Sequence, residues 1–92
     1  QLAPDNSDHL LKSSSIVKNI DYAKDRIEYD TFDQDSEELF RMQKKPGMVM
    51  ADEKKLNKTT KTNVDGWMWQ DLENGGVLKV KHSVGNKISI VK

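Results

Sequence analysis

Residues 64–82 read VDGWMWQDLENGGVLKVKH, and this stretch decides the fold that we expect. It contains both tryptophans and an Asn-Gly-Gly sequence at 74–76, a strong signal for a tight turn between two strands. We therefore predict strands over 64–69 and 77–82 that pair through this turn. Because Trp67 and Trp69 are two residues apart, they face the same side of a regular strand.

The rest of the chain repeats this pattern of short apolar or alternating runs separated by polar turns. We expect further strands at 9–22, 26–32, 37–42, 48–51 and 87–92, with Leu56 returning to the core and an exposed loop at 57–63. Residues 37–42 would also suit one turn of helix. Expected turns lie at 33–36, 45–47, 52–55 and 83–86.

Such regular spacing of short strands is typical of antiparallel β-proteins. We predict an all-β fold: a small antiparallel β-sandwich, immunoglobulin-like or similar, with about seven short strands. A small barrel is the alternative.

The length of 92 residues supports one hydrophobic core and therefore one domain. Residues 1–8 are polar and predict a flexible lead-in or linker, and residues 9–92 predict a single sandwich domain. Because the chain begins with Gln1 and not with Met, we expect it to be a fragment or processed product of a larger protein.

The composition of the chain excludes several classes of function. Fifteen Lys and Arg balance fifteen Asp and Glu, so no overall field favours nucleic acid. The absence of cysteine excludes disulfides, thiolate metal sites and cysteine catalysis. No stretch approaches the roughly 20 apolar residues of a membrane-spanning helix, so we predict no membrane insertion, and we expect a monomer.

The aromatic residues are the main candidates for ligand binding. Trp67 and Trp69 could form a platform on which a sugar stacks, with Tyr29 or Tyr22 as further stacking residues. The alternative, which we favour, is that at least one tryptophan faces the core, because the chain has few other large apolar side chains. Hydroxyl partners in the binding interpretation would be Asp65, Gln70 and Asp71.

Acidic residues open a sequence similar to a calcium loop. Asp33, Asp35 and Glu37 have the alternating spacing of its first ligands, but Glu38 and Lys44 stand where glycine and glutamate are required. We interpret the segment as a solvated turn and predict no metal site.

The two histidines, His9 and His82, belong to no metal-binding or nucleophile motif. His82 has the parity of the apolar residues in its expected strand, so we expect it to pack in the core or to cap the strand end. We predict no catalytic residues, no cofactor and no enzymatic activity.

Several segments resemble the C-terminal β-sandwich modules of bacterial carbohydrate-active enzymes. The resemblance rests on residues 48–56 (MVMADEKKL), 66–69 (GWMW) and 76–82 (GVLKVKH), supported by 21–23 (DYA) and 29–33 (YDTFD). This chain departs from that pattern at Asp52-Glu53, where a turn glycine is usual, and in the longer polar loop at 57–63.

The resemblance implies a non-catalytic accessory module of a secreted glycosidase-like protein. Its partner would be a neighbouring domain of the same polypeptide, and its location periplasmic, at the cell surface or secreted. Carbohydrate is a second partner that the resemblance allows, bound through the aromatic residues named above.

Overall fold

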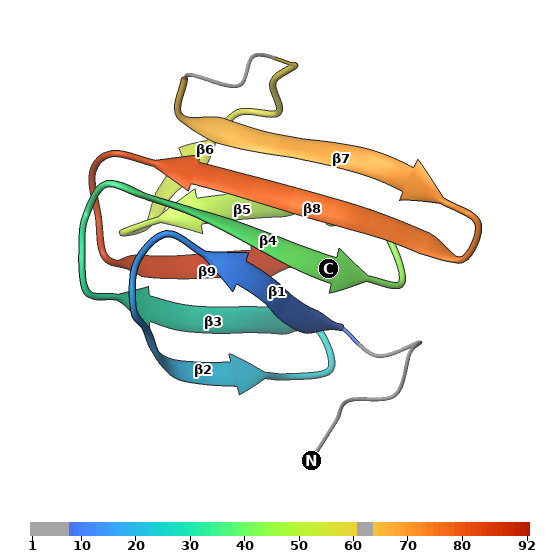
Figure 1. Ribbon diagram of the computed structural model, residues 1–92, viewed down its shortest axis with the longest axis horizontal. Helices are drawn as coiled ribbons and strands as arrows, with labels where there is room; N and C mark the ends of the chain where they lie inside the picture. Colours follow the sequence, from blue (N-terminus) through green and yellow to red (C-terminus); the bar gives the residue numbers. More distant parts are fainter. Residues whose placement is uncertain (1–7, 61–63) are drawn as a thin grey trace.

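The computed structural model describes residues 8–60 and 64–92 and shows two antiparallel sheets packed face to face (Figure 1). The prediction of a small all-β sandwich is confirmed, and the sheets do not close into a barrel. The described part of the chain contains no helix long and apolar enough to cross a membrane.

Nine strands make up the two sheets within the described residues. The four-stranded sheet contains β1 (His9–Ser13), β4 (Ser36–Met42), β8 (Gly75–His82) and β7 (Gly66–Leu72), in that order. The five-stranded sheet contains β2 (Val17–Tyr22), β3 (Arg26–Thr31), β9 (Lys87–Val91), β5 (Met48–Ala51) and β6 (Lys54–Leu56), in that order. Nine strands replace the expected seven because residues 9–22 form two strands and Leu56 ends a short strand of its own.

The core lies between the sheets, where alternate residues of the central strands point inward. The rings of Tyr29 and Phe40 meet there from opposite sheets, with centroids 5.2 Å apart. Full burial of one large apolar side chain stabilises the fold by about 1.5–3 kcal/mol. The other buried apolar residues are Ile27, Met42, Val49, Ala51, Trp67, Leu78, Val80, Ile88 and Ile90.

The expectation of one strand over 9–22 is wrong, because the chain crosses from one sheet to the other after β1. Leu10 and Ile20 pack against the core, but Ile16 lies in the crossing and is exposed. Tyr22 is also exposed, and its hydroxyl accepts a hydrogen bond from the Leu10 amide.

The serines between β1 and β2 explain this crossing. The Ser13 hydroxyl accepts the Ser15 amide at 3.1 Å, and the Ser14 hydroxyl accepts the Glu37 amide at 2.9 Å. Such bonds compete with a regular strand ladder and favour a turn. The expected turn at 33–36 is one residue too long, because Ser36 is buried and begins β4.

The β7–β8 hairpin forms, but its turn is Glu73-Asn74 and not the glycine pair. Gly75 has a φ of 101°, and a Cβ there would overlap the Met42 carbonyl oxygen. A Cβ on Gly76 would overlap the Trp69 ring. The glycines are therefore needed because neighbouring groups approach the backbone closely.

Part of the expected loop at 57–63 covers the free edge of β7. The Trp67 amide donates to the Asn57 carbonyl at 3.0 Å, and the Thr59 amide donates to the Trp67 carbonyl at 2.8 Å. Backbone groups at this edge are thereby satisfied. Residues 61–63 of the expected loop, like 1–7 of the expected lead-in, lie outside the described residues.

Candidate functional site

The two tryptophans face the core. On β7, Trp67 pairs with Val80 and Trp69 pairs with Leu78, and both partners are fully buried residues of β8. Trp67 is only 5% exposed, whereas Trp69 is half-buried and packs against the core from the edge of the sheet. The interpretation that at least one tryptophan points inward is confirmed by Trp67.

Tyr29 does not join the tryptophans in a surface platform. It is 1% exposed, and its hydroxyl donates to Glu38 Oε1 at 2.7 Å. A ring in this position cannot stack on a surface ligand, so the sequence-based assignment of Tyr29 to a binding face does not fit the fold. Two of the three proposed hydroxyl partners are also engaged: Asp71 accepts the Trp69 indole N–H at 2.6 Å, and Asp65 accepts the Ser83 hydroxyl at 2.6 Å.

A buried polar cluster of Tyr29, Ser36, Glu38 and His82 lies at the core, and sequence reasoning missed it. Glu38 and His82 are both completely buried. Glu38 Oε1 accepts hydrogen bonds from Tyr29 and from His82 Nε2, at 2.7 and 3.1 Å, and Glu38 Oε2 accepts the Ser36 hydroxyl. Three strands from the two sheets, β3, β4 and β8, therefore meet at one carboxylate.

The contacts of His82 match those of a positively charged imidazolium, which donates from both ring nitrogens. Its Nδ1 lies 2.7 Å from the Gln34 carbonyl oxygen, and its Nε2 faces the Glu38 carboxylate. A carbonyl and a carboxylate oxygen only accept hydrogen bonds, so both ring nitrogens must donate. The cluster thus contains a buried imidazolium–carboxylate ion pair.

The pKa values follow from this geometry. Burial alone would raise the pKa of Glu38, but hydrogen bonds from His82, Ser36 and Tyr29 and the charge of His82 lower it below its ordinary value of 4.5. Burial alone would lower the pKa of His82, but the bond to Glu38 and its charge, with the Gln34 and Gly85 carbonyls, raise it above 6.5. Burial and the neighbouring Glu38 raise the pKa of Tyr29.

The residue types of this cluster occur in hydrolases, but the arrangement does not suit catalysis. A serine nucleophile needs a histidine within hydrogen-bond reach as its base, whereas Ser36 bonds to Glu38. The cluster is also closed to solvent, so a substrate could not reach it. Its role is structural.

The acidic residues of the calcium-like segment are spread along the surface. Asp35 lies 3.7 Å from the Lys81 ammonium and Glu37 lies 3.3 Å from that of Lys79. Among residues 8–60 and 64–92, no group of three or more His, Cys, Asp or Glu side chains is placed to hold a metal ion.

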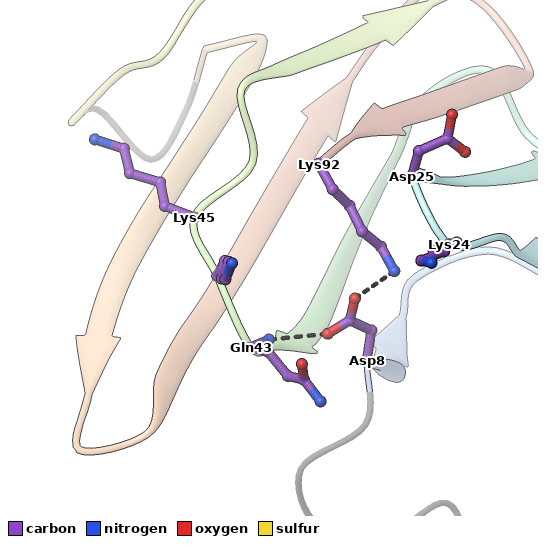
Figure 2. A pocket seen from close by; sticks show the side chains of 7 residues that line it. Asp8, Lys24, Asp25, Gln43, Lys45 and Lys92 are labelled. Carbon is purple, nitrogen blue, oxygen red and sulfur yellow. Dashed lines mark hydrogen bonds and ion pairs between the residues drawn. The ribbon is translucent and has the colours of Figure 1, made fainter.

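An open pocket of about 540 Å³ lies at the end of the sandwich that carries the β2–β3 turn and the β4–β5 loop (Figure 2). We call it the lysine pocket. Its lining is formed by Asp8, Lys24, Asp25, Gln43, Lys44, Lys45 and Lys92.

Asp8 joins three segments at this pocket. Its carboxylate accepts the Gln43 amide at 2.8 Å and lies 2.6 Å from the Lys92 ammonium (Figure 2), which also donates to the Ala23 carbonyl at 3.1 Å. Asp8 was expected to belong to a flexible lead-in, but these contacts make it part of the folded domain.

The β1–β2, β3–β4 and β8–β9 turns lie at the opposite end of the sandwich (Figure 1), and each carries an exposed apolar side chain. Ile16, Phe32 and Val84 are 66%, 66% and 60% exposed, and we call them the apolar end. Ile16 and Phe32 are adjacent, since the Phe32 amide donates to the Ile16 carbonyl at 2.8 Å.

Comparison of the chain with protein-family models, with curated proteins and with solved structures gives no match. The function of the chain must therefore be inferred from the geometry of its own residues. The lysine pocket and the apolar end are two surfaces that lie outside the core.

Proposed function

We propose that this chain is a non-catalytic accessory module of a larger, secreted, bacterial carbohydrate-processing protein. It acts by packing its apolar end against a neighbouring domain of the same polypeptide. The resemblance of residues 48–56, 66–69 and 76–82 to such modules supports the class of protein, and the β-sandwich fold agrees with it.

The observation that carries the proposal is the exposure of Ile16, Phe32 and Val84 on turns at one end of the sandwich. Large apolar side chains stabilise a small domain when they are buried in its core, so exposed ones on turns at the same end of the sandwich indicate a contact surface. Each would contribute about 1.5–3 kcal/mol on full burial against a partner. The cluster around Glu38 supports the non-catalytic part of the proposal, because its polar groups are buried and hydrogen-bonded to one another.

A carbohydrate-binding function is the second candidate, and it would depend on Trp69. This half-buried residue borders a hollow of about 140 Å³ that is also lined by Met68, Gln70, Val77 and other residues. Its ring packs against the core, so a sugar in the hollow would meet only the exposed part of Trp69, with the Gln70 amide as a hydrogen-bonding partner. Trp69→Ala should then abolish binding to a glycan array while the domain stays folded.

The main proposal is tested in the full natural polypeptide. We expect its gene to encode a carbohydrate-processing catalytic domain beside this one. The triple variant Ile16→Ser/Phe32→Ser/Val84→Ser should lower the Tm of the neighbouring domain by several degrees in calorimetry, because it removes the apolar contact.

The matched control is Leu11→Ser/Leu72→Ser, which changes exposed apolar residues outside the apolar end. This control should leave the Tm of the neighbour unchanged. A gene that encodes no such catalytic domain, or a Tm loss that is equal in the triple variant and the control, would refute the proposal.

A further inference from the structure

The walls of the lysine pocket are held in place by backbone hydrogen bonds. The Lys92 amide donates to the Asp25 carbonyl at 3.0 Å, and the Gly47 amide donates to the Val91 carbonyl at 2.8 Å. The β2–β3 turn is closed by a bond of 2.8 Å from the Ala23 amide to the Arg26 carbonyl. The pocket is therefore preformed, which lowers the entropic cost of binding a ligand.

The charges in this pocket are unbalanced. Asp8 and Lys92 neutralise one another. Lys24 and Lys44 form no hydrogen bond or ion pair with any residue in the described ranges 8–60 and 64–92. With Lys45 and Asp25 counted as well, the lining has four lysines against two aspartates, an excess of two positive charges in a chain of zero net charge.

Lys45 and Lys58 extend the positive surface beyond the pocket. In Figure 2 the Lys45 side chain points away from Lys92. The neighbouring Lys45 lowers the pKa of Lys58, and Asp71 opposes this change. Two neighbouring cations repel one another, and an anion bound between or beside them would relieve the repulsion.

The lining also excludes other ligand classes. A metal cation would need several free carboxylates, but both oxygens of Asp8 are already bound, which leaves Asp25 as the one other carboxylate among the described lining residues. No aromatic ring lines the pocket, so a neutral sugar would have no stacking surface. Lysine ammonium groups are suited to carboxylate, sulfate and phosphate oxygens.

We propose that the lysine pocket binds an oxyanion group of a small molecule, with Lys24 and Lys44 as the cations that contact it. The volume of about 540 Å³ is that of a pocket for a small organic ligand and exceeds the needs of a bare ion. The anion is therefore a carboxylate, sulfate or phosphate carried by a body the size of a monosaccharide. This site lies away from the apolar end, so it does not depend on the docking function.

The test is a calorimetric titration of the folded domain at constant ionic strength with glucuronate, inorganic sulfate, inorganic phosphate and neutral glucose. We expect saturable binding of glucuronate and none of glucose. Lys24→Gln/Lys44→Gln should weaken glucuronate binding by about five- to tenfold, since it removes two exposed ion pairs and each changes the affinity by up to about fivefold. Both lysines lack partners among the described residues, so this variant should fold normally.

The matched control is Lys54→Gln/Lys55→Gln on β6, which removes the same charge away from the pocket. Glucuronate affinity should stay within about twofold in this control. Sulfate or phosphate binding as tight as that of glucuronate, and equally sensitive to Lys24→Gln/Lys44→Gln, would support the oxyanion site with a free ion as its ligand. Absence of saturable binding of every anion, or equal losses in the two variants, would overturn the proposal.

Discussion

The completely buried Glu38 accepts hydrogen bonds from three side chains, and one of these donors, His82, is positively charged. Buried ion pairs contribute little net stability, but removal of one partner leaves the other charge uncompensated. We therefore expect Glu38→Gln to lower the free energy of unfolding by about 3–5 kcal/mol, measured by urea denaturation.

The neighbouring residue on the same strand provides the control. Glu37 is on the outer face, partly exposed, and paired with Lys79 at 3.3 Å. Glu37→Gln should change the free energy of unfolding by no more than about 0.5 kcal/mol. Similar effects of the two variants would show that the buried charge has no special role.

Glu53 occupies a strained turn position. Asp52 and Glu53 connect β5 and β6 with φ values of 49° and 69°, which glycine adopts without steric cost. Glu53→Gly should therefore raise the Tm, with a gain of up to about 1 kcal/mol. Asp52 must be kept, because its carboxylate accepts the Lys87 amide at 3.1 Å; Asp52→Gly should lower the Tm in the same calorimetric measurement.

At the level of elements, the β7–β8 hairpin shows how far sequence reasoning reaches. The alternation of apolar residues correctly predicts two paired strands and places Trp67 and Trp69 on one face. The glycines were assigned to the turn, because Asn-Gly-Gly is a turn signal. Glycine is required at position 76 because the Trp69 ring of the neighbouring strand crosses its backbone. This contact can be found only when the register of β7 and β8 is known.

Substitution of Gly76 tests this contact. A Cβ on Gly76 would overlap the Trp69 ring and the Gln70 carbonyl oxygen, so the ring must move. We expect Gly76→Ala to cost about 1–3 kcal/mol and to increase acrylamide quenching of the Trp69 fluorescence, measured in a Trp67→Phe background. Gly47→Ala, where an added Cβ would meet only the Val91 carbonyl oxygen at 3.8 Å, should leave the quenching unchanged.

For the other elements too, local sequence patterns predict the strands but not the contacts between residues that are far apart in the chain. The strands that we predict over 26–32, 37–42 and 87–92 form as β3, β4 and β9, each with one end shifted by one residue, because the pattern that predicts them is local. The Glu38–His82 pair was not, since these residues are 44 positions apart and meet only when β4 and β8 pair in one register. Their parity with Phe40 and Val80 was the available signal, because it places them on the inward face.

For the whole molecule, the buried ion pair predicts how stability depends on pH. The pKa of His82 is raised above 6.5, so its contribution is complete below about pH 6.5 and is lost as the pH rises through the raised pKa. The pKa of Glu38 is lowered below 4.5, so its contribution is complete above about pH 4.5 and is lost as the pH falls through the lowered pKa. Urea denaturation should show maximal stability between about pH 4.5 and 6.5.

The variant Glu38→Gln/His82→Gln separates this effect from the titration of surface groups. It lacks both charges, so the decline above pH 6.5 should be much smaller than in the natural protein. An equal decline in the two proteins would mean that His82 is not the group that titrates.

The Glu38 cluster also joins the sandwich into one cooperative unit. Its hydrogen bonds connect β4 and β8 of one sheet with Tyr29 of the other, so they can all form only after the sheets have docked. Separation of the sheets would expose the apolar faces and break the Tyr29 bond to a charged group at once. In hydrogen-exchange measurements, amide protons in the centres of both sheets should consequently exchange through the same global unfolding. Neither sheet should keep its amides protected after the other has opened.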